Sequence, residues 1–540
     1  MSKLSRILVS FLLFMGTLFP INQVRAEDRV TLPTPKEIAG FQLTETPGTW
    51  QLGAIPPNVD LNKPPVVFVQ GRSRHAQDWW SKTEYHGIND MYEMAYNAGY
   101  RTVFVHLHDS AGKGTASPYD NGQLLAKSLK EISQHYGQKV NIVAHSKGGI
   151  DAQAALVHYN AYPYVGKIVT LGSPNYGSHL ADMAYSWYAS WLTKLVGEQD
   201  AGAYSLQTGE MEKFRKQTDH HPNVMKNDYY TTAGTSWGPS ASALWLAGLT
   251  LSSYGENDGL VNISSTYLPY GTHLFTIPAD HDSIRKGSVS FQLMEPVLRS
   301  AAPTKSPKMA FSQAMPKPTP STQAADQSLA GGSLSANQPI EKSISIDAKE
   351  ATVQIMTKSP DVKVTLQSPS GKVYDKSSSN YVLAKGDELF GDVTDQSFQL
   401  KGEETGNWKV RIQSPSKDAY FLVTSYKGSQ DLSLDLPSPE STKESSLKLK
   451  MNQSENYDSG SMNVDVKVID SEGKEVKQQL QEKGYQSRMK RDVRSSNEYT
   501  VPLPTDVKPG LYNITVQVTG KKKSGKSFER TLVKSVYIGK

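Results

Sequence analysis

The sequence predicts an α/β domain with a mostly parallel sheet, followed by two antiparallel β-sandwich domains. In the first 300 residues, short runs of β-branched and aromatic residues alternate with segments of helical periodicity. This alternation is typical of a parallel sheet covered by helices. From about residue 341, apolar and polar residues instead alternate at period two between turn signals. That second pattern indicates antiparallel strands with one buried and one solvated face.

The elements expected in the α/β domain follow one another closely. The first core strand is the apolar run at 65–69. The remaining elements are a helix at 89–98, a strand at 100–107, a helix at 123–136, a strand at 140–144, a helix at 149–159 and a strand at 167–171.

Composition changes sharply near residue 301. Residues 301–340 are rich in Pro, Ser, Ala, Thr and Lys and have no sustained apolar periodicity, so we expect a linker there. Beyond it, 341–428 and 429–540 each contain several alternating runs, for example Val362, Val364 and Leu366. We therefore expect two all-β, Ig-like sandwich domains, 341–428 and 429–540.

The N-terminus has the layout of a secretory signal peptide. A positive start at Lys3 and Arg6 precedes an apolar stretch at 7–21, and Ala26 is the small residue at the expected cleavage site. The alternative is a retained anchor, but the apolar stretch is shorter than the roughly 20 residues that span a bilayer. We expect cleavage of residues 1–26, a catalytic domain at 27–300, a secreted extracellular protein, and no transmembrane segment in the mature chain.

Composition excludes several classes of protein. The net charge of +5 over 540 residues gives no concentrated basic face, so we expect no nucleic-acid partner. The chain has no cysteine, which excludes thiolate nucleophiles, thiolate metal sites and disulfides. An exported chain without disulfides points towards a bacterial origin.

Ser146 is the candidate nucleophile. Residues 140–149 (VNIVAHSKGG) form a buried strand, a small-x-Ser-x-Gly turn and the start of a helix. Ala144 and Gly148 are small, as the close crossing of strand and helix requires, and such a turn exposes a serine hydroxyl beside a helix N-terminus. The alternative is that Ser146 merely caps the helix.

These residues resemble the bacterial lipases of the α/β-hydrolase superfamily, among which Ala-x-Ser-x-Gly is a frequent variant. Residues 171–182 (LGSPNYGSHLAD) are similar to the family segment L-G-[ST]-P-x-x-G-S-x-x-A-D. The resemblance covers about residues 60–300 and not the C-terminal half. It implies an α/β-hydrolase fold and a serine hydrolase in which the nucleophile is followed along the chain by an acid and then a histidine.

The expected acid is Asp258 and the expected base is His281. The segment 257–261 (NDGLV) matches the family's acid turn, and an Asx-Gly turn presents a carboxylate in a tight loop. His281 follows an apolar, strand-like run, as a base in a loop after a strand should. His273 is the alternative base, and its place at the start of that run favours a structural role.

Backbone N–H groups of Arg72 and Lys147 are the expected oxyanion hole. Lys147 follows the nucleophile, and Arg72 follows the first core strand, where Gln70 stands in place of the histidine usual in the family. The aromatic stretch 185–195 predicts a single helix over the site, either a lid that opens at a lipid surface or an ordinary cap helix.

No cofactor is expected. Some lipases of the family bind a structural calcium through an aspartate two residues beyond the base. In this chain that position is Ser283, and Asp282 lies one beyond. The sequence therefore predicts neither a calcium nor another metal site.

The expected reaction is hydrolysis of a lipid or other apolar carboxylic ester, as in a triacylglycerol lipase or esterase, through an acyl-serine intermediate. One alternative is an extracellular polyester depolymerase of the polyhydroxyalkanoate type, since such enzymes also carry β-sandwich modules. Another is a surface adhesion protein with a vestigial hydrolase domain. The C-terminal sandwiches are candidates for contact with a cell surface or polymer.

Overall fold

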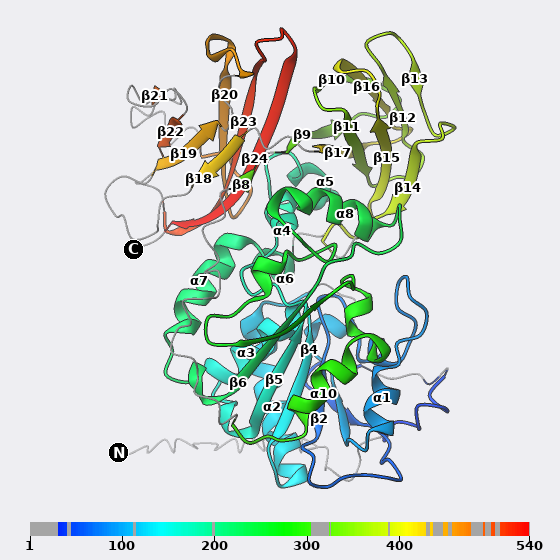
Figure 1. Cartoon of the computed structure of the whole chain (residues 1–540), viewed down its shortest axis with the longest axis vertical. Helices are drawn as coiled ribbons and strands as arrows, with labels where there is room; N and C mark the ends of the chain where they lie inside the picture. The colour runs from blue at the N-terminus through cyan, green and yellow to red at the C-terminus, as the bar shows by residue number, and fades with distance from the viewer. Residues whose placement is uncertain are drawn as a thin grey trace, which may run out of the picture.

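The computed structural model has an α/β part below and two β-sandwiches above it (Figure 1). It describes residues 31–39, 41, 45–111, 115–196, 200–303, 323–324, 326–386, 389–427, 432–435, 446–451, 456–476, 490–491, 498–502 and 508–538. The expected signal peptide and residues 304–322 of the expected linker lie outside the described residues. Within the described ranges, no helix has the length and apolarity to cross a membrane.

A seven-stranded sheet forms the centre of the α/β part, in the order β1-β3-β2-β4-β5-β6-β7. Strand β1 (Trp50–Leu52) pairs antiparallel to β3, and all the other pairs are parallel. The central strands are buried along their whole length because helices cover both faces. The parallel strands are β2 (Val66–Val69), β3 (Thr102–Val105), β4 (Val140–His145), β5 (Val165–Leu171), β6 (Asp228–Gly234) and β7 (Thr272–Ile277).

Two pairs of helices cover this sheet. Helices α2 (Pro118–Tyr136) and α3 (Lys147–Val157) contribute to the apolar core on one face. Helices α1 (Met91–Asn97) and α10 (Gln292–Leu298) contribute to the core on the other face. Helix α2 begins five residues before its expected start because Ser117 caps it and a proline occupies its first position. The predicted α/β class is confirmed.

A helical cap lies between the sheet and the sandwiches (Figure 1). It consists of the helices inserted after β5 and β6, which we call the cap throughout. These are α4 (His179–Ala184), α5 (Ser190–Val196), α6 (Ala201–Ser205), α7 (Thr208–Asp219) and α8 (Ala243–Leu251). The short α9 (Ile263–Thr266) follows the acid turn.

The prediction of one helix at 185–195 is wrong. Helix α4 ends at Ala184 and α5 starts only at Ser190. In the gap, the Ser186 hydroxyl accepts a hydrogen bond from the Ala189 N–H, and the Ser190 hydroxyl donates to the Trp187 carbonyl. Serine side chains that bond to nearby backbone compete with helical hydrogen bonds, so the aromatic run is broken by its own serines.

The first sandwich packs a four-stranded sheet, β10-β16-β12-β13, against a five-stranded sheet, β14-β15-β11-β17-β9. Every pairing is antiparallel, and the fully buried Trp408 lies in the core between the sheets. The strands are β9 (Gln327–Leu334), β10 (Ile340–Ile346), β11 (Glu350–Thr357), β12 (Lys363–Gln367), β13 (Val373–Tyr374), β14 (Tyr381–Lys385), β15 (Thr394–Lys401), β16 (Gly406–Gln413) and β17 (Asp418–Tyr426).

The second sandwich combines the sheets β21-β22-β19-β18-β8 and β20-β23-β24. All of its pairings are antiparallel as well. The predicted β-sandwich class of the C-terminal half is confirmed. The strands are β8 (Gln323–Ala324), β18 (Leu432–Asp435), β19 (Ser446–Met451), β20 (Asn463–Asp470), β21 (Lys490–Arg491), β22 (Glu498–Pro502), β23 (Gly510–Lys521) and β24 (Ser527–Ile538).

The expected linker at 301–340 extends too far, because strand β9 lies inside it. Strand β9 pairs with β17 over its whole length and buries Leu329 and Leu334. Gly331 allows a close approach to the cap, since a Cβ there would lie 2.0 Å from the Tyr188 carbonyl oxygen. Composition alone underestimated this segment because its burial depends on tertiary partners.

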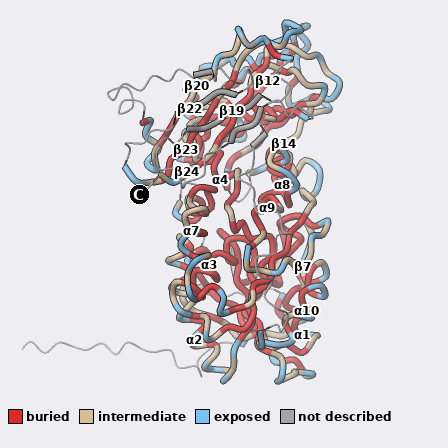
Figure 2. Tube along the Cα trace, turned by 60° about the vertical axis from the view of Figure 1, so that its left-hand side comes forward, coloured by how far each residue is buried: buried red, intermediate tan, exposed pale blue. Residues whose placement is uncertain are grey.

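The sandwiches and the cap share one apolar core. Met183 and Ala247 of the cap are buried in the same cluster as Phe390 and Phe421 of the first sandwich, and buried chain runs through the junction (Figure 2). Polar contacts reinforce it from the second sandwich, because the Ser535 hydroxyl donates to Asp182 of α4 at 2.6 Å. The junction therefore has the character of a domain core rather than of a loose contact.

Candidate active site

Ser146 occupies the sharp turn between β4 and α3. Its backbone has φ 53° and ψ −131°, a conformation that non-glycine residues rarely adopt and that concentrates at functional sites. Its N–H donates to the Leu171 carbonyl at 2.9 Å, which ties the turn to the neighbouring strand β5. Its hydroxyl makes no capping bond to α3, so the alternative in which Ser146 is only a helix cap is wrong.

Small residues surround this turn because strand and helix cross at close range. A Cβ at Gly148 would lie 2.3 Å from the Gln70 carbonyl oxygen, and one at Gly149 would lie 2.1 Å from the Ser173 hydroxyl. A Cβ at Gly71, in the loop after β2, would lie 3.0 Å from the Ser146 Cβ. The loop that carries Gly71 therefore lies directly against the nucleophile candidate.

Asp258 and His281 are joined by two hydrogen bonds. The His281 Nδ1 lies 2.8 Å from the Asp258 Oδ2, and the His281 N–H donates to the Asp258 carbonyl at 2.8 Å. The other carboxylate oxygen accepts the N–H groups of Leu260 and Val261 at 3.1 and 2.8 Å. One oxygen therefore fixes the turn while the other orients the imidazole, which is the division expected of an acid that holds a base in one tautomer.

The loop after β7 brings His281 to the nucleophile turn. The imidazole Nε2 of His145, the residue before Ser146, lies 2.9 Å from the His281 carbonyl oxygen, and the two imidazole rings are 4.7 Å apart. Burial lowers the pKa of His145 well below its ordinary value, so a neutral ring lies beside His281. The structure thus gathers Ser146, Asp258 and His281 in the loops that follow β4, β6 and β7, at one edge of the sheet.

The alternative base, His273, lies elsewhere. Its ring nitrogens lie 3.2 Å from the Thr231 hydroxyl and 2.8 Å from the Thr276 hydroxyl, on strands β6 and β7. These contacts are those of a histidine that stabilises a sheet edge. Of the two candidate histidines, only His281 contacts Asp258.

The side chains of Gln70 and Arg72 connect the loop after β2 to two other parts of the molecule. The Gln70 amide donates to the Ser110 hydroxyl at 2.7 Å and so attaches this loop to the segment after β3. The Arg72 guanidinium pairs with Asp200 of the cap at 2.9 Å. The Gln70 side chain therefore makes a structural bond in the position where the lipases that the sequence resembles usually have histidine.

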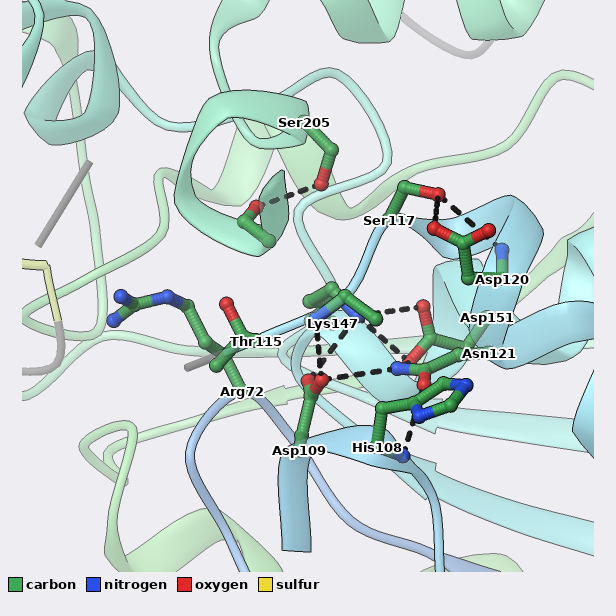
Figure 3. A network of polar contacts seen from close by, with 12 residues as sticks. Arg72, His108, Asp109, Thr115, Ser117, Asp120, Asn121, Lys147, Asp151 and Ser205 are labelled. Atoms are coloured by element: carbon green, nitrogen blue, oxygen red, sulfur yellow. Dashed lines mark hydrogen bonds and ion pairs between the residues drawn. The ribbon is translucent and has the colours of Figure 1, made fainter. Parts of the chain in front are cut away.

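The Lys147 side chain is fully buried in a network that the sequence did not predict (Figure 3). Its Nζ lies 2.9 Å from Asp151 and 3.2 Å from Asp109, and the Asn121 amide donates to both carboxylates. Burial alone would lower the pKa of Lys147, but the two carboxylates raise it above its ordinary value. The i,i+4 spacing of Lys147 and Asp151 was the only signal in the sequence; Asp109 arrives from the end of β3.

The network predicts a pH-dependent stability. Burial raises the pKa of Asp151 from 3.8 to about 7, so the folded chain keeps a proton that the unfolded chain loses near pH 4. The contribution of this group to stability is therefore complete below pH 4 and is lost as pH rises to about 7. Asp151→Asn should remove this dependence, so its free energy of unfolding relative to wild type should rise between pH 4.5 and 7.5.

Urea unfolding at the two pH values measures the effect. Asp361→Asn, at an exposed position, is the matched control and should track the wild type. A stability difference between Asp151→Asn and wild type that is the same at both pH values would contradict the expectation.

The aspartates beside His281 have structural partners. Asp280 lies 2.6 Å from the His86 imidazole, and its Oδ1 accepts the N–H groups of Asp282 and Ser283. Asp282 pairs with Arg285 at 2.6 Å. Among the described residues, no three or more His, Asp or Glu side chains are grouped as a metal site. Asp280 and Asp282 therefore act as capping and pairing residues for the loop that carries His281.

The three candidate catalytic residues are almost fully buried. Ser146 is 4% exposed, and Asp258 and His281 are each 1% exposed. Little of the surface of Ser146 is therefore accessible to solvent in this conformation.

Comparison with known proteins assigns the family. No protein-family model and no curated protein sequence matches the chain. Among solved structures, the lipase BlEst2 of Bacillus licheniformis in its propeptide form is similar with a TM-score of 0.71 and 30% identity, over 91% of this chain and 98% of that chain. The mature form of the same lipase is 45% identical over 47% of this chain and 99% of that chain, with a TM-score of 0.43. With the similarity to the propeptide form extending over nearly all of both chains, the protein belongs to the bacterial lipases of the α/β-hydrolase superfamily and is a carboxylic ester hydrolase.

Proposed function

We propose that the protein hydrolyses lipid or other apolar carboxylic esters through an acyl-Ser146 intermediate. The Ser146 hydroxyl attacks the ester carbonyl while His281 takes its proton, and His281 then returns the proton to the leaving alcohol. Water enters with His281 again as base and releases the acid. Asp258 orients His281, and the N–H groups of Arg72 and Lys147 bind the oxyanion. No step requires a cofactor.

The observation that carries the proposal is the contact of His281 with both Asp258 and the nucleophile turn. The 2.8 Å bond from His281 to Asp258 and the 2.9 Å contact of His281 with His145 hold the imidazole beside a serine in a strained turn. A vestigial domain has no reason to keep the strained backbone, the oriented base and the paired acid together. This arrangement favours an active hydrolase over an adhesion protein with a vestigial domain.

Covalent labelling tests the nucleophile. A small organophosphonate ester should attach to Ser146 in the full chain, and mass spectrometry of the digested protein should find the adduct on the peptide that contains it. Ser146→Ala should not be labelled, whereas Ser133→Ala, a serine of α2 that bonds to the Gln138 carbonyl, should be labelled like the wild type. An adduct elsewhere, or persistent labelling of Ser146→Ala, would refute the proposed nucleophile.

The acyl preference is tested with a series of nitrophenyl esters of increasing chain length and a polyester film. A lipase should favour long acyl chains, an esterase short ones, and a depolymerase the film. Leu244 of α8 lies against Gly259, the residue after Asp258, and an apolar side chain at this place favours an apolar acyl group. We therefore expect activity on lipid esters to exceed activity on the polyester.

We further propose that the two sandwiches act as a propeptide that restrains the cap. The α/β part ends with α10 at Leu298, so a similarity over 91% of the chain extends well into the sandwiches, and the lipase concerned was crystallised in a propeptide form. The cap core shared with Phe390 and Phe421 supplies the restraint. Secretion through a signal peptide ending at Ala26 is part of the same proposal, and a mature N-terminus at residue 27 would support it.

A further inference from the structure

The two residues proposed to supply the oxyanion N–H groups both carry buried cationic side chains. Lys147 is fully buried and the Arg72 side chain is 2% exposed. A buried cation is stable only where a carboxylate or hydrogen-bond acceptors compensate it, and a guanidinium stays charged at all relevant pH values. The partners of these side chains therefore determine where the two backbone segments lie.

The Lys147 side chain is held entirely from within the α/β part. Asp109 follows β3, Asn121 belongs to α2 and Asp151 belongs to α3 itself. Figure 3 shows these side chains converging on the Lys147 amine from neighbouring elements. The N–H group of Lys147 is thus fixed in the frame of the sheet, whatever the cap does.

The Arg72 side chain is held from the cap. Its Nη2 lies 2.9 Å from the Asp200 Oδ2. The other oxygen of Asp200 accepts the Ala203 N–H at 2.8 Å, which caps α6, and is hydrogen-bonded by the Thr115 hydroxyl from the loop before α2. Asp200 therefore joins three segments, namely the loop after β2, the loop before α2 and the cap helix α6.

The cap segment that carries Asp200 leads directly to the sandwich. Helix α6 is followed after two residues by α7, whose first residues meet β24: the Gly209 N–H donates to the Ser535 hydroxyl at 2.7 Å. Displacement of α6 or α7 would move Asp200 away from Arg72 and leave a buried cation without this carboxylate.

We propose that Asp200 is a positioning residue of the oxyanion hole, acting through the Arg72 side chain on the Arg72 N–H group. The inference rests on the proposed function, in which that N–H group binds the oxyanion. It assigns one half of the hole to the fixed frame of the sheet and the other half to the cap. The geometry of the hole consequently depends on the position of the cap.

Asp200→Asn tests the proposal in the full chain. The amide can still cap α6 and accept from Thr115, but it lacks the charge that holds Arg72. We expect kcat on a short nitrophenyl ester, per active site titrated to completion with the organophosphonate, to fall about tenfold, a fraction of the 10²- to 10³-fold cost of losing an oxyanion donor outright. KM should change less than twofold, because the ester carbonyl of the ground state depends little on the hole.

Inhibition by a boronic acid distinguishes a positioning role of Asp200 from a purely structural one, because a loss of stability alone would not change the inhibition. The Ser146 oxygen adds to boron while its proton passes to His281, which gives a tetrahedral anion with an oxygen in the hole. Inhibition by phenylboronic acid should weaken by the same factor as kcat. Glu210→Gln, which removes the carboxylate that pairs with Lys213 at 3.0 Å in α7, is the matched control and should leave kcat and inhibition unchanged.

Arg72→Met removes the other partner of the same ion pair, so it provides a second test if Asp200→Asn folds poorly. It should reproduce the loss of kcat, and the double variant should lose no more than either single variant. A kcat within twofold of Glu210→Gln in either folded variant, or a lowered Tm with unchanged kcat and boronate inhibition, would overturn the proposal. Failure of the proposed function is distinguished by the wild type, which would then not be labelled at Ser146.

Discussion

His281→Ala is expected to lower kcat on a short nitrophenyl ester by about 10⁵-fold or more, and Ser146→Ala should do the same. The two side chains act as a unit in the proposed mechanism, because the hydroxyl is a weak nucleophile until the imidazole takes its proton. The Ser146→Ala/His281→Ala double variant should therefore lose no more than either single variant. Stopped assays with several hours of incubation are sensitive enough to measure the residual rates.

Asp258→Asn should cost less, about 10⁴-fold. The amide keeps the contacts of the turn, since one carboxylate oxygen accepts the N–H groups of Leu260 and Val261. The 2.8 Å bond to the His281 Nδ1 would then no longer select the productive tautomer. His273→Ala is the matched histidine control and should retain wild-type kcat. Loss of activity in His273→Ala with retention in His281→Ala would reverse the assignment of the base.

The local parts of this site could be predicted from the sequence, because short segments determine them. The turn at Ser146 requires a buried strand, small flanking residues and a helix, and all three are contiguous in residues 140–157. The Asp258 turn is likewise formed by its own Asx-Gly chemistry, with backbone bonds to residues two and three positions on. Such features depend little on the rest of the fold, and the structure places both residues where their motifs require.

The parts that the sequence did not reveal depend on residues far apart along the chain. Asp109 reaches Lys147 because β3, β2 and β4 are neighbours in the sheet, and Asp200 reaches Arg72 because a cap helix folds back over the loop after β2. Burial of a Lys and an Arg also contradicts the average behaviour of these residues. Carboxylate partners stabilise that burial, and no local pattern in the sequence indicates those partners.

The core shared by the cap and the first sandwich is a second feature that the sequence did not reveal. Phe421 lies in an apolar run of β17, residues 419–423, and nothing in that run indicates that its side chain shares a core with Met183 and Ala247 of the cap. The break between α4 and α5 has the same origin: the aromatic periodicity favours one helix, whereas serine bonds and packing against β9 and β17 favour two.

Removal of the sandwiches is expected to raise the rate on long-chain esters about hundredfold. Ser146 is 4% exposed and His281 is 1% exposed. Under the proposed restraint of the cap, the full chain binds a long-chain ester only in a minor open state, and minor states separated by a few kcal/mol are populated at roughly 0.1–10%. The apparent rate falls by that same fraction. Residues 27–303, expressed alone and compared with the full chain per titrated active site, give the measurement.

A point variant shows whether the higher rate comes from release of the cap or from the apolar surface that removal of the sandwiches exposes. Phe421→Asp places a charge in the buried core shared by β17 and the cap, where an uncompensated carboxylate is strongly unfavourable, so it should detach the sandwich and raise the rate in the full chain. Val373→Asp changes an exposed apolar residue of the same sandwich and should leave the rate unchanged. If residues 27–303 and Phe421→Asp are both folded, titrate fully and turn over long-chain esters no faster than the full chain, the sandwiches do not restrain the cap.

Because Asp200 couples the cap to Arg72, release of the cap should raise substrate access and also change the affinity of the site for the boronic acid. The two effects can be measured in the same samples.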